Sequence, residues 1–240
     1  MLKKIKEFII NIFLPKRCIY CGKILDYNAL LSICKKCVIP ALAKEKPRRD
    51  FIEKYFDAVL CATYYEKHIR YAMIKFKFKS ITSLADTFSH MMLIKVKEDW
   101  RFLTSDIITS VPLSDKRLKE RGYNQSHLLA KNLAPKLDMP YNEKLLVKVK
   151  DIPRISKLTL SQRRKIVRGV YKFDNNFDIR GKKIILIDDI FTTGSTANEC
   201  ARILKKNGAQ SVFVLTACET RQKTDIIEEK SKEDFYIKDL

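Results

Sequence analysis

The sequence lacks any apolar run of the roughly 18 residues that a membrane-spanning helix needs. It also lacks the long apolar core and the small-residue cleavage site of a secretory signal, although basic residues precede FIINIFL near its start. We therefore expect a cytoplasmic protein with reduced cysteines. An apolar stripe over residues 2–14 predicts a short helix that either packs on the protein or contacts the inner face of the membrane peripherally.

Acidic residues are scarce relative to basic ones. The chain of 240 residues has 28 Asp and Glu against 48 Lys and Arg, and its formal charge is +20. Residues 1–49 carry +9 of this charge and residues 115–173 carry +11. Such segments suggest a nucleic acid, an anionic membrane surface or a pyrophosphorylated substrate as the partner, although a general lysine bias would also make a surface basic. At 46% hydrophobic and 32% charged residues, the chain is globular in composition.

Cysteine is infrequent, and four of the seven cysteines form two CxxC pairs separated by twelve residues. This spacing offers four thiolates to a tetrahedral ion and predicts a structural zinc site at Cys18, Cys21, Cys34 and Cys37. Disulfides are the alternative, which a reducing compartment disfavours. Each of the other three cysteines lies in an apolar segment and is expected in the core: Cys61, Cys200 and Cys218.

Strands alternate with helices along the rest of the chain, which predicts an α/β domain with a mainly parallel sheet. Strands are expected at 58–64, 107–111, 184–187 and 212–216, and helices at 68–79, 84–96, 116–137 and from 197 to Asn207-Gly208. The expected organisation is a metal-binding module at 1–50, a main domain at 51–220 and a charged tail at 221–240.

The stretch IILIDDIFTTGST at 184–196 is the most informative one. A buried strand is expected to end at Asp188 and Asp189, and a hydroxyl-rich turn then leads into a helix. Amides at a helix N-terminus bind phosphate, and paired carboxylates accept bonds from vicinal sugar hydroxyls or help to hold a divalent cation. A phosphorylated sugar would suit both the helix start, which binds phosphate, and the carboxylates, which bind sugar hydroxyls. The alternative is a core strand whose acids merely precede a helix. The turn consists of Thr192, Thr193, Gly194, Ser195 and Thr196.

A second stretch, VPLSDKR followed by RGYNQS, also comes after an expected strand. Ligands of such sheets lie beyond the carboxyl ends of the strands, so both loops can share one edge. Arginine offers a planar fork to two phosphate oxygens, and we expect a pyrophosphate loop here unless the segment is only a solvated basic helix start. Its candidate residues are Pro112, Leu113, Ser114, Lys116, Arg117 and Arg121.

Residues 184–196 resemble the phosphoribosyl-pyrophosphate (PRPP) loop of type I phosphoribosyltransferases. That resemblance implies that the turn holds a 5′-phosphate and that Asp188 and Asp189 contact ribose hydroxyls. Together, CxxC…CxxC, VPLS…RGYNQS and LIDDIFTTGST closely resemble the competence protein F (ComF) family, over nearly the whole chain up to about residue 220. The family implies a zinc finger before a phosphoribosyltransferase-like domain, and a role in natural transformation. Ile155 and Ile166 stand where the family usually has Gln and Asn.

Two functions remain open. One is a DNA-uptake factor that binds single-stranded DNA and a PRPP-like ligand, with a competence helicase or DNA-processing protein as a further partner. Basic residues interleave with aromatic ones over 64–79, and Arg163, Arg164 and Lys165 are the candidate DNA contacts. The other is an active phosphoribosyltransferase that uses PRPP and Mg²⁺, for which no acceptor pocket or dedicated base is recognisable. A weaker third interpretation is a zinc-dependent nucleic-acid binder without a sugar-phosphate ligand.

Overall fold

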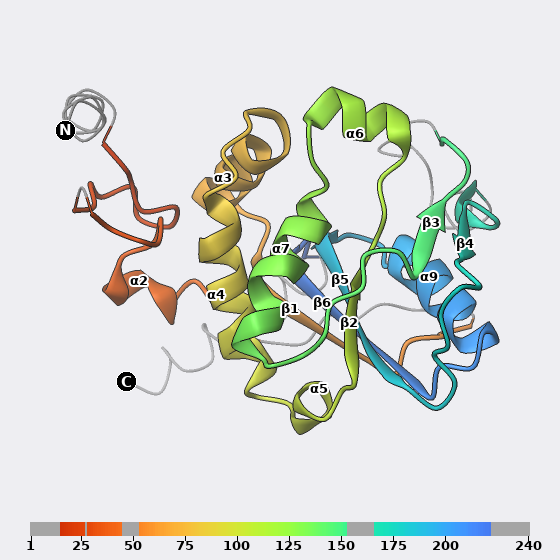
Figure 1. Cartoon of the computed structure of the whole chain (residues 1–240). Coiled ribbons are helices and arrows are strands. Elements are labelled where there is room, and N and C mark those ends of the chain that lie inside the picture. Colours follow the sequence, from red (N-terminus) through yellow and green to blue (C-terminus); the bar gives the residue numbers. More distant parts are fainter. Residues whose placement is uncertain (1–14, 27, 45–52, 153–165, 222–240) are drawn as a thin grey trace, which may run out of the picture.

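A parallel sheet of four strands, in the order β1-β6-β5-β2, forms the centre of the protein (Figure 1). The computed structural model describes residues 15–26, 28–44, 53–152 and 166–221. The strands are β1 (Ala58–Tyr64), β2 (Ile107–Ser110), β5 (Lys183–Phe191) and β6 (Ser211–Glu219). All three neighbouring pairs are parallel, which confirms the predicted sheet. The architecture is therefore an α/β fold built on a parallel four-stranded sheet.

Helices cover both faces of this sheet, as its nearly continuous apolar strands require. Helices α3, α4 and α7 pack on one face and α9 on the other. The helices are α2 (Lys35–Val38), α3 (Lys67–Phe78), α4 (Leu84–Val96), α5 (Trp100–Leu103), α6 (Asp115–Arg121), α7 (Gln125–Leu133) and α9 (Ser195–Lys206), with a 3₁₀ turn, η1 (Ala134–Lys136). The predicted helices at 84–96 and after the TTGST turn are thus confirmed.

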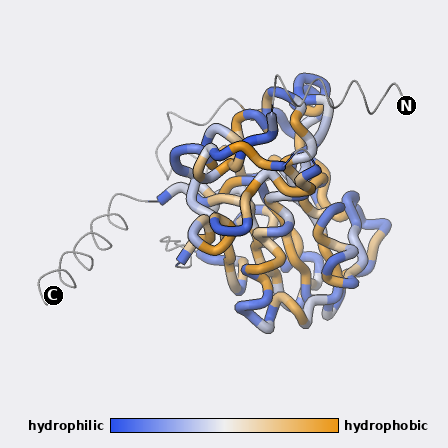
Figure 2. Tube along the Cα trace, turned by 90° about the vertical axis from the view of Figure 1, so that its left-hand side faces the viewer, coloured by the Kyte–Doolittle hydropathy of each residue, from blue (hydrophilic) through white to orange (hydrophobic). Residues whose placement is uncertain are grey.

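Alternate residues of each strand pack into two separate hydrophobic cores, one on each face of the sheet. Ile185 and Ile187 of β5 face the α3, α4 and α7 side, whereas Ile184 and Leu186 face α9. All four are fully buried, because the strand lies between two helical layers. Figure 2 shows the hydrophobic stretches concentrated in the body and the hydrophilic stretches at its outer turns.

The predicted helix at 116–137 is wrong in one respect: the structure has two helices there. Helix α6 ends at Gly122, whose φ of 77° lies in the left-handed region that glycine adopts without strain. Helix α7 then begins after Asn124, whose side chain accepts a hydrogen bond from the Ser126 amide at 3.0 Å. The break turns the chain back toward the sheet and places the RGYNQS residues beside β5.

The expectation that β5 ends before the two acids is also wrong. The strand continues to Phe191, because its neighbour β6 continues alongside it and offers backbone partners, such as Thr216 opposite Asp188. Asp188 and Asp189 therefore lie inside a strand and are positioned by the sheet ladder. A two-stranded antiparallel sheet that the sequence analysis did not predict, β3 (Leu146–Lys148) with β4 (Tyr171–Phe173), lies beside α9.

The cysteine-bearing segment of residues 15–44, which we name the cysteine module, packs against the main domain (Figure 1). The Ala43 amide donates to the Ala62 carbonyl at 2.9 Å, so the end of the module lies along the outer edge of β1. Ser32 and Thr87 of α4 are joined by a hydrogen bond of 2.7 Å. These contacts cover an otherwise open sheet edge.

Some predictions concern parts of the chain outside the described residues. They are the amphipathic helix at 2–14, the DNA contacts Arg163, Arg164 and Lys165, Ile155, and the tail after residue 221. Within the described ranges, no helix is both long enough and apolar enough to cross a bilayer.

Candidate phosphosugar site and cysteine cluster

The two loops singled out in the sequence emerge side by side at the carboxyl edge of the sheet. Strands β2 and β5 are direct neighbours, and Ser110 at the end of β2 pairs with Ile187, the residue before Asp188. The Val111 amide donates to the Ile187 carbonyl at 2.9 Å, which extends this contact by one residue. The predicted arrangement of the loops on one edge is therefore confirmed, whereas the roles of their residues stay predictions.

The turn before α9 brings hydroxyl groups to the start of that helix. Gly194 has a φ of 72°, which a residue with a side chain adopts only under strain. The Thr193 and Ser195 hydroxyls are 2.9 Å apart, and the Ser195 amide donates to the Thr193 hydroxyl at 3.4 Å. Thr192 is exposed, and Thr196 is half-buried at the first turn of the helix. Hydroxyls and helical amides thus gather where a phosphate can bind.

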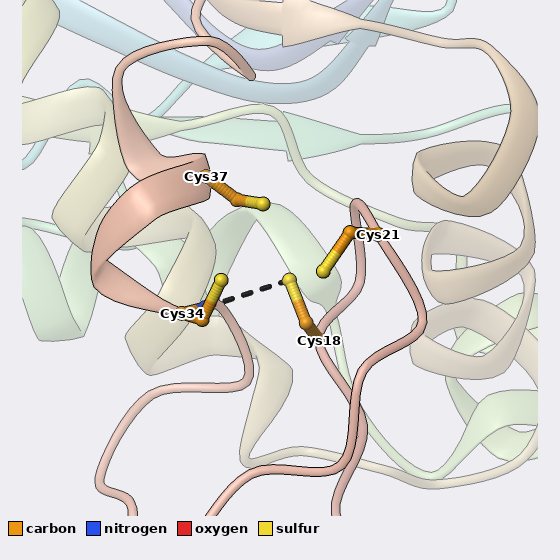
Figure 3. A group of neighbouring side chains, drawn as sticks. All are labelled: Cys18, Cys21, Cys34 and Cys37. Carbon is orange, nitrogen blue, oxygen red and sulfur yellow. Dashed lines mark hydrogen bonds between the residues drawn. The ribbon is translucent and has the colours of Figure 1, made fainter.

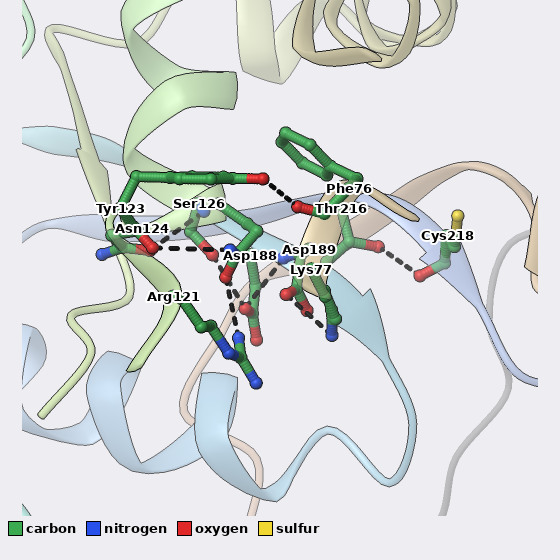
Figure 4. A network of polar contacts seen from close by, with 11 residues as sticks. Phe76, Lys77, Arg121, Tyr123, Asn124, Ser126, Asp188, Asp189, Thr216 and Cys218 are labelled. Carbon is green, nitrogen blue, oxygen red and sulfur yellow. Dashed lines mark hydrogen bonds and ion pairs between the residues drawn. The ribbon is translucent and has the colours of Figure 1, made fainter. Parts of the chain in front are cut away.

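The two acids have different partners (Figure 4). One Asp188 oxygen accepts hydrogen bonds from the Ser126 hydroxyl at 3.1 Å and from the Asp189 amide at 2.8 Å. Asp189 forms an ion pair with Lys77 of α3, at 2.8 Å between Nζ and Oδ2. The pair is therefore held by side chains from two different helices.

Burial, reinforced by the charge of Asp189, raises the pKa of the Asp188 carboxyl to about 7. The Lys77 ammonium and the hydrogen bond from Ser126 oppose this rise. A carboxyl with such a pKa changes its protonation state near neutral pH. In the ionised form both of its oxygens accept hydrogen bonds from a sugar, whereas in the protonated form one oxygen carries a proton and acts as a donor.

The RGYNQS segment forms hydrogen bonds to several elements that surround the acidic pair. The Tyr123 hydroxyl donates to the Phe76 carbonyl of α3, and the Asn124 amide group donates to the Val111 carbonyl at 3.0 Å. Arg121 donates to Gln125 at 2.7 Å and lies over the Phe78 ring, 5.1 Å from its centroid. The segment thereby links α3, β2 and α7 around the acidic pair.

The residues of the predicted pyrophosphate loop differ in burial and in hydrogen bonding. Pro112 and Leu113 are half-buried, and Lys116 is exposed. Arg117 is half-buried and donates to the Ile152 carbonyl at 3.3 Å. The Ser114 hydroxyl is buried without a hydrogen-bond partner among the described residues. An unpaired buried hydroxyl costs free energy, which a bound ligand can recover.

Sequence reasoning did not select four residues that the structure places at this site. Ser126 and Lys77 contact the acids, as described above. Lys148 of β3 lies over the Tyr171 ring, 5.7 Å from its centroid. Burial lowers the pKa of the Lys148 ammonium, and the Arg117 charge lowers it further.

Burial raises the pKa of the Tyr171 hydroxyl, and a side-chain hydrogen bond with Thr196 opposes this rise. Ser126 stands within the quoted RGYNQS motif, but no local pattern marks the other three.

The four cysteines of the CxxC pairs converge, as their spacing predicts. Their Sγ atoms all lie within 4.8 Å of one another, and in Figure 3 the four side chains point toward a common centre. A tetrahedral zinc ion would bring sulfurs to about 3.8 Å from each other, so a small inward shift suffices. Burial opposes ionisation of Cys18, but hydrogen bonds from the backbone at Cys21, Cys34 and Tyr20 prevail and lower its pKa to about 7. The cluster fits a metal ion that prefers thiolates.

The remaining cysteines are core residues, as predicted. Cys61, Cys200 and Cys218 are all at most 1% exposed. Burial raises the pKa of the Cys200 thiol well above its usual value, so this side chain is an apolar packing group.

Comparisons with known proteins agree with these features. A family model for the phosphoribosyl transferase domain matches residues 124–238. The chain is 28% identical to competence protein F of Haemophilus influenzae over 203 residues, which cover 82% of each protein. It is 33% identical to competence protein ComFC of Bacillus subtilis over 159 residues, 63% of this chain and 60% of that protein. It is 26% identical to the DNA utilization protein YhgH of Escherichia coli K12, over 79% of this chain and 85% of the relative.

Among solved structures, the chain is similar to the glutamine PRPP amidotransferase of B. subtilis complexed with ADP and GMP. The match has a TM-score of 0.42 and 18% identity, and covers 60% of this chain but only 30% of the amidotransferase. Adenine phosphoribosyltransferase of Saccharomyces cerevisiae gives a TM-score of 0.40 at 17% identity, covering 65% of this chain and 77% of that one. With its match to the phosphoribosyl transferase domain and its four-cysteine cluster, this chain is similar to the competence protein F and YhgH proteins, as the sequence analysis expects.

Proposed function

We propose that this protein is a DNA-uptake factor of natural transformation, which binds single-stranded DNA and a PRPP-like ligand through its phosphoribosyltransferase-like domain. Its relatives are named for competence and DNA utilization, which supports the cellular role. Its charge of +20 supports a polyanionic partner. The geometry at the carboxyl edge of the sheet supports the phosphosugar.

The observation that carries the phosphosugar assignment is the convergence of three kinds of group on one edge. The N-terminus of α9 offers amides and hydroxyls for a 5′-phosphate. Asp188 and Asp189 offer acceptors for vicinal ribose hydroxyls. Ser114, with its unpaired buried hydroxyl, lies in the neighbouring loop that would take the pyrophosphate. A phosphate without a sugar would leave the acids unused, and a plain sugar would leave the helix start unused.

Magnesium is the expected companion of the pyrophosphate. Carboxylate and phosphate oxygens suit Mg²⁺, and the acidic pair provides protein oxygens near the proposed pyrophosphate. When bound, the ion would neutralise pyrophosphate charge. Lys116, Arg117 and Arg121 would share that task, with the arginine forks oriented by their contacts to Ile152 and Gln125.

An active transferase is the second candidate function. The acidic pair, the turn at 192–196 and the basic loop are all in place, which favours it. In that reaction the bond from the ribose anomeric carbon to pyrophosphate breaks, and a bond to a nucleophile forms as the nucleophile loses its proton. An assay for pyrophosphate release from Mg²⁺–PRPP in the presence of candidate acceptors tests this function separately from binding.

We propose a division into a metal-binding module at 1–50, a phosphoribosyltransferase-like domain at 51–220 and a charged tail at 221–240. The module would hold one structural zinc ion. We propose a cytoplasmic location, a competence helicase or DNA-processing protein as a further partner, and peripheral membrane contact through residues 2–14. Each of these assignments follows from sequence pattern and family resemblance.

The DNA part of the proposal is tested by fluorescence anisotropy of a labelled single strand and of the matching duplex, each titrated with salt. We expect the single strand to bind at low salt and to lose affinity steeply as salt rises, because side chains that pair with phosphates release counterions. Replacing Arg163, Arg164 and Lys165 by glutamine should flatten the salt slope by about 0.7 for each phosphate that is no longer neutralised. Absence of single-strand binding by the wild-type protein at low salt would reject this part.

A further inference from the structure

We infer that a hollow between the cysteine module and helix α3 is a surface on which single-stranded nucleic acid binds, with a base stacked on Tyr71. The inference rests on the proposed function and assigns its DNA contacts to described residues. The hollow has a volume of about 760 Å³. We call it the α3 hollow; the basic and aromatic residues of its lining are Lys16, Arg17, His68, Tyr71 and Lys75. In Figure 1 the cysteine module lies beside α3 and α4.

Tyr71 provides a stacking platform. It is 60% exposed, whereas Phe76 on the same helix is completely buried in the core. Lys75, one turn further along α3, places its Nζ 4.4 Å from the Tyr71 ring centroid. An aromatic ring next to a cation is the combination with which proteins hold single strands, because the ring takes a base and the cation takes a phosphate.

The described part of the chain places no compensating negative charge in the α3 hollow. No acidic residue lines it among the described residues, and helix α3 itself contains none. Lys16 donates to the Ala29 carbonyl at 2.7 Å, and Arg17 donates to the Gly22 carbonyl at 3.3 Å. These hydrogen bonds orient the two cations without neutralising them, so their charge remains available to a polyanion.

A single strand fits these features better than an anionic membrane does. Membrane contact of this kind uses apolar side chains that protrude from a surface, whereas Tyr71 borders a recess. A duplex keeps its bases stacked on each other, so their faces are not accessible to a tyrosine. The surface provides a ring and charges rather than a set of base-edge contacts, so we expect binding with little sequence preference.

The first test compares variants by anisotropy of a labelled oligothymidylate at low salt. Tyr71→Ala should weaken binding by about fivefold to a hundredfold, whereas Tyr71→Phe should keep most of the affinity because stacking needs only the ring. Lys75→Gln should lower the salt slope by about 0.7. Trp100→Ala and Lys206→Gln are matched controls: both residues are exposed and lie on other helices, away from the hollow, and neither change should affect binding.

The second test detects base stacking directly, by fluorescence. Trp100 is the only tryptophan of the chain, so Tyr71→Trp made together with Trp100→Phe places the sole indole in the α3 hollow. Oligothymidylate should quench its fluorescence, and added salt should restore it. Wild-type binding together with full binding by Tyr71→Ala and no quenching would overturn this inference and leave the proposed function standing. The inference would also be overturned if the wild-type chain did not bind oligothymidylate, and that result would reject DNA binding as the function as well. It would be overturned in favour of a membrane partner if Tyr71→Ala lost binding to phosphatidylglycerol vesicles but kept its binding to oligothymidylate.

Discussion

Lys77 of α3 and Asp189 of β5 form an ion pair of 2.8 Å at the carboxyl edge of the sheet. Both side chains are mostly buried, at 16% and 14% exposure, so solvent screens their attraction only partly. The contact brings a cation from a distant helix to one acid of the pair. The other acid, Asp188, forms no such ion pair within the described residues, and its pKa is raised to about 7. The two neighbouring carboxyls are thus electrostatically different.

The first prediction is that PRPP binding is pH-dependent. Because Asp188 is protonated below about pH 7 and ionised above it, affinity should rise by about tenfold between pH 6 and pH 8 as the carboxylate becomes available to ribose hydroxyls. Calorimetric titrations at both pH values measure this change. Asp188→Asn is the matched control, because the phosphate groups of the ligand titrate identically with both proteins. An equal pH dependence in the two proteins would contradict the role of Asp188.

The second prediction concerns Lys77. Its positive charge lowers the pKa of Asp188, so Lys77→Met should raise that pKa further and move the midpoint of pH-dependent binding upward. At pH 7 the variant should bind PRPP more weakly than the wild type, and the deficit should shrink at higher pH. Lys79→Met, at the exposed end of the same helix, serves as the control and should leave the midpoint in place. A midpoint that moves downward would refute the electrostatic account.

The third prediction separates stability from binding at Ser114. Its hydroxyl is buried and unpaired among the described residues, so Ser114→Ala should leave the free energy of unfolding unchanged or raise it by about 1 kcal/mol. PRPP affinity should nevertheless fall by about tenfold or more, because the variant cannot form a hydrogen bond to a charged oxygen of the ligand. Urea unfolding and calorimetry measure the two effects.

Ser83→Ala is the matched control for this change. Like Ser114, Ser83 precedes a helix without capping it through its side chain, but Ser83 is exposed and the helix that follows it is α4. Its replacement should not affect PRPP affinity. If Ser114→Ala destabilises the protein and binds PRPP normally, the hydroxyl has a structural partner and no ligand.

The fourth prediction concerns the metal. Elemental analysis should find one zinc per chain in the wild type and none after Cys34→Ser and Cys37→Ser together, since two thiolates do not retain the ion. The melting temperature should also fall, because the free energy of metal binding contributes to folding. Cys200→Ala removes a buried thiol elsewhere and should retain the zinc. Full zinc in the double variant would show that the ion has other ligands.

The sequence predicts those features that depend on neighbours along the chain. The apolar run at 184–187 identifies a strand buried on both faces, and two CxxC pairs are sufficient to predict a four-cysteine cluster. The extension of β5 to Phe191 is different, because it depends on β6 offering backbone partners as far as Glu219. Local composition cannot show this, and the acids Asp188 and Asp189 suggest a strand end instead.

Contacts between distant segments account for the rest of what the sequence analysis missed. Lys77 reaches Asp189 only because α3 packs beside β5, and nothing in the basic sequence of α3 distinguishes this lysine from its neighbours. Gly122 is a partial exception: a glycine after a helix is a known stop signal, but helical spacing resumes beyond it and conceals the break. Tyr71 and Phe76 both look like candidate stacking residues, and only packing shows that Phe76 belongs to the core.

The most direct test of the account is calorimetry of PRPP binding, with and without Mg²⁺, to the wild type and to the chain carrying Asp188→Asn and Asp189→Asn. We expect one site per chain, with tighter binding when Mg²⁺ is present. Each asparagine should cost roughly 1.5–3 kcal/mol of binding free energy, with some non-additivity because the two residues are adjacent. No binding by the wild type, or unchanged binding by the double variant, would contradict the assignment of the phosphosugar site.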